Sequence, residues 1–234
     1  MIAVDIEKDL LISLLKLTKE GPVLIENVNK EVRSTTNIIP KLIKRLENED
    51  LISKNNDFVE VVKDNRLRLA VRAISLGADL EHVSSFLDWQ EFEDIAALAL
   101  ERNGYTTVMN MRFRKEGRRW EIDVVGCRNP LVLCIDCKHW QRSMNPSALR
   151  KIVMAQVKRT YALATTLPTP SIKVECVKWN KAKFIPIILS LIPGRLKFYE
   201  NVPVVSVLQL QDFLNQVPAY VESLKYITRD FNHL

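Results

Sequence analysis

The sequence predicts a two-part chain in which a small helical unit precedes a larger α/β domain, with a mixed central sheet flanked by helices. Apolar residues recur at helical spacing through the first part. From Asp88 onward, strand-like runs alternate with helical stretches, which favours helices packed on a sheet. The run 131–135 is continuously apolar, as expected of a central strand buried on both faces. A chain of 234 residues is long enough for this organisation.

The first unit, residues 1–64, carries apolar stripes on three stretches. Leu10, Leu11, Leu14 and Leu15 form the first stripe, and Gly21-Pro22 ends that helix. We expect a second helix over Val23 to Val32 and a third whose stripe runs from Ile38 to Leu46. A hairpin follows, turning at Asn55-Asn56 before the strand-like run 58–62.

Three helices and a hairpin are the order of a winged helix-turn-helix, whose third helix enters the major groove of DNA. Lys41 and Lys44 lie on the exposed side of that predicted helix, which makes them candidate nucleic-acid contacts. The unit is net acidic, however, and winged helices also serve as dimerisation and partner modules. DNA contact and a protein partner both stay open.

Residues 65–87 are predicted to form a helical linker and residues 88–234 the α/β domain. The expected elements of this domain alternate along the chain. They are a helix at 89–102, strands at 105–113, 120–125 and 131–138, a helix at 146–165, strands at 173–178, 184–191 and 204–208, and a closing helix at 211–226.

Acidic and basic residues stand at the ends of two predicted strands. Side chains alternate along a strand, so Asp136 and Lys138 share one face while Cys137 points to the other. On the preceding strand, Asp123 lies on the face opposite its apolar residues. The connection over 126–130 is short enough for a hairpin, so we expect Asp123 beside Asp136.

The predicted helix 89–102 supplies a third carboxylate. A helical wheel places Glu93 with the apolar packing residues, whereas Glu91 falls on an outer face with Asp94 and Glu101. A carboxylate on a packing face is costly unless something pairs with it. Three acids and a lysine at one point suit Mg²⁺- or Mn²⁺-assisted phosphodiester hydrolysis, with the lysine orienting the attacking water.

The segment from Asp88 to about Gln216 resembles the PD-(D/E)XK nuclease superfamily, which has a restriction-endonuclease-like fold. Within that superfamily it resembles the Mrr-type restriction endonucleases and the archaeal Holliday junction resolvases. The residues that carry the resemblance are Phe92-Glu93, Gly104-Tyr105, Glu121-Ile122-Asp123, Asp136-Cys137-Lys138 and His139-Trp140.

The resemblance implies a metal site and a catalytic lysine. Asp123, Asp136 and the main-chain carbonyl of Cys137 would be metal ligands, Glu93 the helix acid and Lys138 the catalytic lysine. Ile122 departs from the family pattern, which has proline before the first aspartate. The resemblance also implies DNA, duplex or branched, as substrate, and a homodimer.

Further candidate nucleic-acid contacts lie beside these motifs. They are Arg112, Arg114, Arg118 and Arg119 around a predicted turn at Glu116-Gly117, His139 and Arg142 after the lysine, and Gln156 on the following helix. A basic hairpin is also compatible with simple solvation. Cys134 and Cys137 have C-x-x-C spacing, but strand alternation points them to opposite sides, so we interpret them as core cysteines rather than zinc ligands.

Net charge and the search for targeting signals restrict the class of binding partner and the compartment that we expect. The net charge is +6, yet residues 1–64 hold 10 Lys/Arg against 12 Asp/Glu, so the basic excess belongs to the later part, where it suits a polyanion. No secretory signal or membrane-spanning apolar run is visible, so we expect a cytoplasmic protein with no membrane partner. The prediction is a metal-dependent DNA endonuclease. The alternatives are a non-catalytic DNA-binding or scaffold protein and, among nucleases, a Holliday junction resolvase.

Overall fold

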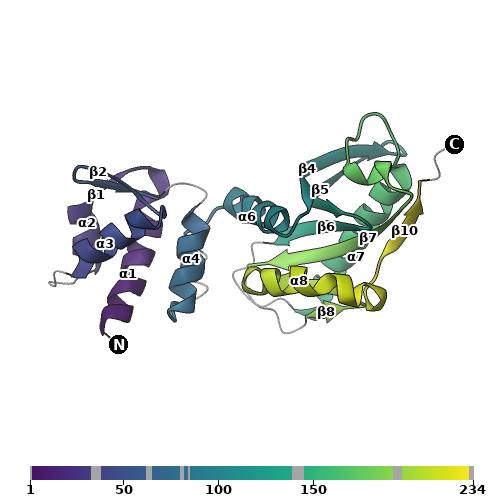
Figure 1. The fold of residues 1–234 in the computed structure, drawn as a ribbon. Helices are drawn as coiled ribbons and strands as arrows, with labels where there is room; N and C mark the ends of the chain where they lie inside the picture. Colours follow the sequence, from purple (N-terminus) through teal and green to yellow (C-terminus); the bar gives the residue numbers. More distant parts are fainter. Residues whose placement is uncertain are drawn as a thin grey trace. The chain divides into compact units, whose positions relative to one another are not determined.

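The computed structural model describes residues 2–32, 38–61, 65–79, 82–83, 85–138, 145–191 and 197–231. The chain divides into two compact units, Met1–Phe92 and Glu93–Leu234 (Figure 1). This division falls inside the helix α6 (Trp89–Arg102). The domain boundaries that the sequence predicts at residues 64 and 87 stay predictions. Each unit is described by itself.

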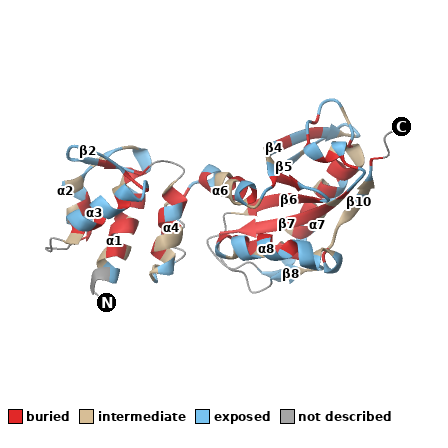
Figure 2. Cartoon of the chain, in the orientation of Figure 1, coloured by how far each residue is buried: buried red, intermediate tan, exposed pale blue. Residues whose placement is uncertain are grey.

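Within its described residues, the first unit combines helices with a small antiparallel sheet. Its elements are α1 (Ile2–Leu17), η1 (Thr18–Glu20), β1 (Val23–Leu24), α2 (Ile25–Val32), α3 (Ile38–Asn48), β2 (Ser53–Asn55), β3 (Phe58–Glu60) and α4 (Arg66–Ser75). The three strands lie in the order β1-β3-β2. The predicted second helix begins two residues too early, because Val23 and Leu24 pair with β3 instead. The leucine stripe of α1 and the apolar stripe of α3 are buried (Figure 2).

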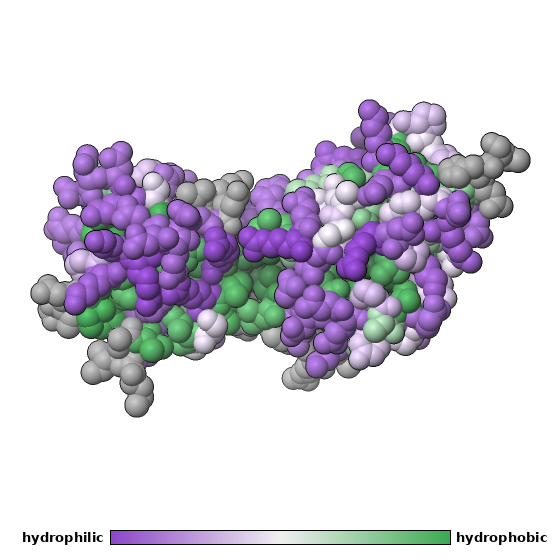
Figure 3. All heavy atoms as spheres, viewed as in Figure 1, coloured by the Kyte–Doolittle hydropathy of each residue, from purple (hydrophilic) through white to green (hydrophobic). Residues whose placement is uncertain are grey.

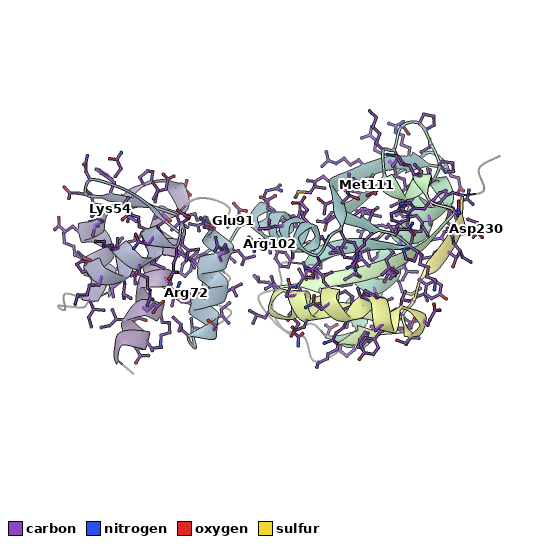
Figure 4. All side chains as sticks on the ribbon, in the orientation of Figure 1. Lys54, Arg72, Glu91, Arg102, Met111 and Asp230 are labelled. Carbon is purple, nitrogen blue, oxygen red and sulfur yellow. The ribbon has the colours of Figure 1, made fainter. Side chains whose placement is uncertain are left out.

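The sequence predicted an outer, solvent-facing position for Glu91, which is labelled at the start of α6 in Figure 4. In the structure, the Glu91 side chain is buried. Its Oε1 atom lies 2.5 Å from Nε of Arg66, which is also buried and donates to the carbonyls of Leu15 and Phe86. Its Oε2 atom accepts from the backbone of Asp88, whose own carboxylate accepts from the Glu91 backbone. This reciprocal capping fixes the start of α6, and Arg66 balances the buried charge. The helical wheel missed this partner because it lies on another element.

The second unit is a mixed sheet with helices on both faces (Figure 1). After α6 come β4 (Thr106–Lys115), β5 (Arg118–Arg128), β6 (Leu131–Lys138), α7 (Pro146–Thr166), η3 (Glu175–Lys178), β7 (Lys181–Ser190), β8 (Phe198–Tyr199), β9 (Val202–Ser206), η4 (Val207–Gln209), α8 (Leu210–Tyr220), η5 (Val221–Ser223) and β10 (Ile227–Asp230). The strand order is β4-β5-β6-β7-β9-β8, and β10 pairs with β7. Strands β4, β5 and β6 are antiparallel neighbours, whereas β6, β7 and β9 run parallel.

Two elements of this unit differ from the sequence prediction. The segment expected as a strand at 173–178 contains the short 3-10 helix η3. The closing helix ends at Tyr220 rather than near residue 226. The chain then adds β10, which pairs with the first four residues of β7, Lys181 to Phe184. Both differences depend on pairing with distant parts of the chain, which local periodicity does not encode.

Helices α6 and α7 cover opposite faces of the sheet. On β5, Gly126 lies so close to Leu100 of α6 that an added Cβ would be 2.9 Å from that side chain. The neighbouring Val125 belongs to the hydrophobic cluster that includes Ala162 and Leu163 of α7. Because neighbouring residues of a strand point to opposite faces, the two helices lie on opposite sides. No helix in the described part of the chain is long and apolar enough to cross a membrane, and hydrophilic side chains cover much of the visible surface (Figure 3).

Candidate active site

Asp123 and Asp136 lie where β5 and β6 separate. The last recorded pair of their ladder joins Val124 to Ile135, so the two aspartates stand one position further along. The backbone N–H of Cys137 donates to Oδ2 of Asp123 over 2.7 Å, which ties the two strand ends together. Burial raises the pKa of Asp123, and the charge of Asp136 raises it further, as expected for two neighbouring carboxylates. The structure therefore brings these aspartates together as predicted.

Asp136 is buried between two cations. Its Oδ1 accepts a hydrogen bond from Nη1 of Arg159 on α7 at 2.9 Å, and Nζ of Lys138 lies 2.8 Å from its Oδ2. Lys138 also donates to the Cys137 carbonyl at 3.2 Å. The buried Oδ2 atom thus has the Lys138 ammonium as its neighbour, and each carboxylate oxygen of Asp136 lies beside a cation.

Arg159 is the residue that the sequence reasoning missed, and it changes the interpretation of Gln156. Gln156 is fully buried, and its side-chain amide donates to the carbonyl of Cys134 at 2.8 Å. Its side chain is therefore not exposed for contact with nucleic acid in this structure. Its Oε1 instead accepts from Arg159 at 3.4 Å. The sequence spacing could have indicated this residue, because Arg159 lies three residues after Gln156 and so shares its face of the helix.

Glu93 is buried, as predicted, but the structure does not gather it with both aspartates. Burial raises the pKa of the Cys137 thiol, and the charges of Asp123 and Glu93 raise it further, which places Glu93 near this strand end. Among the described residues, however, no three His, Cys, Asp or Glu side chains lie close enough to hold one metal ion. The structure brings the aspartate pair together, while the place of Glu93 in the ligand set stays a prediction.

The residues present nevertheless fit Mg²⁺ or Mn²⁺. Mg²⁺ in proteins is usually bound by one or two carboxylates and keeps several waters, instead of occupying a complete protein cage. The carboxylates of Asp123 and Asp136 and the Cys137 carbonyl are hard oxygen ligands of this kind. Cys134 and Cys137 are both buried, and burial raises the pKa of each thiol, as expected of core cysteines.

The basic hairpin of β4 and β5 projects its arginines outward. Glu116 and Gly117 both have positive φ angles, 52° and 75°, the geometry of a type I′ turn. Around it the exposed cations are Arg112, Arg114, Arg118 and Arg119, of which Arg112 pairs with Glu121. In the first unit, Lys41 and Lys44 are exposed on α3. His139 and Arg142 lie outside the described residues.

Comparison with known families gives the identity of this second part of the chain. Residues 85–189 match the Mrr_cat family model, which describes a restriction endonuclease. This segment is a restriction-endonuclease family domain. It contains Glu93, Asp123, Asp136 and Lys138, and its mixed sheet flanked by helices is the restriction-endonuclease-like fold. The predicted membership of the PD-(D/E)XK superfamily is confirmed.

Individual relatives of the restriction-endonuclease domain are distant. An uncharacterized protein of Archaeoglobus fulgidus is 27% identical over 140 residues, which are 59% of this chain and 98% of the relative. The crystal structure of AF1548, a protein of unknown function, is 21% identical with a TM-score of 0.30, and the match covers 42% of this chain and 44% of that one. VC1899 from Vibrio cholerae is 13% identical with a TM-score of 0.40, over 94% of this chain and 53% of that one. This chain thus spans about half the length of each solved relative.

Proposed function

We propose that this protein is a metal-dependent DNA endonuclease that hydrolyses phosphodiester bonds at the Asp123–Asp136 pair. The observation that carries the proposal is the pair of neighbouring carboxylates, Asp123 and Asp136, which lie beside Lys138 in a nuclease-family domain. A structural ion pair has no need for two neighbouring carboxylates whose charges oppose each other.

Each residue has a distinct part in this function. Asp123 and Asp136, with the Cys137 carbonyl, would hold Mg²⁺ or Mn²⁺, and Glu93 would support them from α6. A bound divalent cation lowers the pKa of a coordinated water and offsets negative charge on the phosphate. The Lys138 ammonium, already beside Asp136, would orient the attacking water and stabilise the developing charge. The exposed arginines of the β4–β5 hairpin would contact phosphates beside the site.

The test is cleavage of a substrate panel by the full chain. Supercoiled, linear, branched and single-stranded DNA are incubated with Mg²⁺, with Mn²⁺ or with EDTA. We expect cleavage only with metal, and losses of at least about 10³-fold for Lys138→Ala and Asp123→Ala, because both act on the transition state. Lys151→Ala, an exposed lysine on α7, is the matched control and should keep wild-type activity.

The outcomes separate the alternatives. Binding of DNA with no cleavage of any substrate under either metal would leave a non-catalytic DNA-binding or scaffold protein. Strong preference for a four-way junction over duplex would assign a junction resolvase within the nuclease class. The oligomeric state of the proposed homodimer is measured by light scattering on the same preparation.

For the first unit we propose the winged-helix function. The element order α1-β1-α2-α3-β2-β3 with sheet order β1-β3-β2 supports it, as do the exposed Lys41 and Lys44 on α3. A Lys41→Gln and Lys44→Gln double variant of the full chain should weaken DNA binding and lower its salt slope by about two. If affinity and slope both match the wild type, a protein partner becomes the better assignment for this unit.

A further inference from the structure

A groove of about 720 Å³ in the second unit is lined by cations and aromatic rings. The β4–β5 hairpin, α7 and the approach to β10 each contribute to its walls. The side chains that matter are Lys115, Arg118, Trp120, Lys158, Tyr161 and Lys225. None of them belongs to the Asp123–Asp136 site, so the groove is a separate feature of the fold.

The groove carries a clear positive charge. Four of its lining residues are cations, and Glu116 is the acid among them. Lys115 lies 4.0 Å from Glu116, but Arg118, Lys158 and Lys225 form no ion pair with any residue that the structure describes. Unbalanced cations on three elements around one groove attract a polyanion, such as a chain of phosphates.

The rings in the groove point to a ligand with flat faces as well as charge. Tyr161 is 54% exposed, and Nζ of Lys115 lies 5.1 Å from its ring centroid. The guanidinium carbon of Arg118 lies 4.1 Å from the ring of Trp120, so its plane is held against an aromatic face. The buried Nε1 of Trp120 has no hydrogen-bond partner among the described residues. Exposed rings and supported arginine planes are the surfaces on which unpaired bases stack.

The groove and the active site flank the same part of α7. Arg159, which contacts Asp136, and Tyr161 are two residues apart, about 3 Å along the helix axis and roughly 200° around it. Tyr161 and Arg159 therefore point to opposite sides of α7, with the groove on one side and Asp136 on the other.

We propose that this groove binds an unpaired strand of nucleic acid, with a base stacked on Tyr161 and phosphates on Arg118, Lys158 and Lys225. The inference rests on the proposed nuclease function and specifies its substrate class: DNA with a single-stranded segment next to the cleaved bond. Plain duplex exposes phosphates to the cations but no base face to the ring, so it uses only part of the groove.

Binding without metal tests the groove independently of cleavage. The full chain in EDTA is titrated with a labelled oligothymidine of about 15 nucleotides and with an abasic strand of equal length, using fluorescence anisotropy. We expect the oligothymidine to bind about tenfold tighter, because only it can stack. Tyr161→Ala should remove this difference, and Tyr161→Phe should keep it.

Two further variants separate stacking from charge. Lys158→Gln should weaken both strands equally and lower the salt slope by about one. Tyr220→Ala removes a tyrosine of similar exposure, 57%, from α8 and should change neither affinity.

The outcomes distinguish this inference from the proposed function. Equal binding of the two strands by the wild type, or an unchanged difference in Tyr161→Ala, overturns the groove assignment even if DNA is cut with Mg²⁺. A base-dependent difference that Tyr161→Ala abolishes supports the groove even if no substrate is cut, and then only the nuclease activity fails.

Discussion

Replacing Arg159 with glutamine tests how the buried charge of Asp136 is balanced. The Asp136 side chain is 3% exposed and has a cation on each oxygen, and Arg159 itself is 30% exposed. Removing one partner of a fully buried pair costs about 3–5 kcal/mol. Here Lys138 remains and water reaches Arg159, so we expect a smaller loss of about 1–2 kcal/mol, near the lower end of the range for a hydrogen bond to a charged group. That corresponds to a fall in Tm of about 2–8 °C for a chain of this size.

The same variant should also lower cleavage. Arg159 contacts a proposed metal ligand rather than the substrate, and removing such a supporting residue typically costs about 10–100-fold in metal affinity or activity. DNA affinity measured in EDTA should stay unchanged, because the lost contact lies behind the carboxylate. Arg159→Lys keeps the charge without the planar fork, so it should recover stability better than rate. The measurements are thermal unfolding, Mg²⁺ dependence of plasmid cleavage and metal-free anisotropy.

Arg150→Gln is the matched control, since Arg150 is exposed on the same helix. Identical Tm and cleavage in the Arg159→Gln and Arg150→Gln variants would refute the reasoning. A double-mutant cycle adds a second check: Arg159→Gln should destabilise the Asp136→Asn background far less than the wild type. Additive effects would show that the two side chains do not depend on each other.

Three further predictions follow from other contacts. Burial and the Asp136 charge raise the pKa of Asp123, so ionisation of this carboxyl costs the folded state stability at pH values above its unfolded pKa. Asp123→Asn should therefore raise the metal-free Tm near pH 8 and give no gain below about pH 3.5. Equal Tm shifts at both pH values would contradict this. Arg66→Met leaves the buried Glu91 unbalanced and should cost about 3–5 kcal/mol in chemical denaturation, with Arg68→Met as an exposed control that should cost little. Gly126→Ala places a Cβ 2.9 Å from Leu100 and should cost about 1–3 kcal/mol, relieved by Leu100→Val; an unaltered unfolding curve would mean that Leu100 repacks freely.

Local patterns were enough to predict much of the site. The continuous apolar run gave the strand Leu131–Lys138 with its observed bounds, and the amphipathic stretch Trp89–Arg102 gave α6. The position of Asp123 beside Asp136 followed from strand alternation and a short hairpin connection, both of which act over a few residues. Sequence periodicity encodes such features because it specifies which face of an element a side chain occupies.

Sequence periodicity does not specify which residues pack against a given face of a helix or strand. Glu91 was placed toward solvent by its helical wheel, but Arg66, 25 residues earlier in the chain, covers it. The strand β10 forms by pairing with β7, whereas the segment 173–178 contains a 3-10 helix. Gln156 was a candidate nucleic-acid contact, and the fold buries its side chain against the Cys134 carbonyl.

The aspartate pair shows the division most clearly. The sequence by itself determined that an acid and a lysine end a buried strand beside a second acid, because strand alternation and a short turn are local properties. Only the tertiary structure decided how these charges coexist, because α7 brings Arg159 to Asp136 from 23 residues away. Burial makes an unbalanced charge costly, so the partner supplied by long-range packing sets the electrostatics of the site.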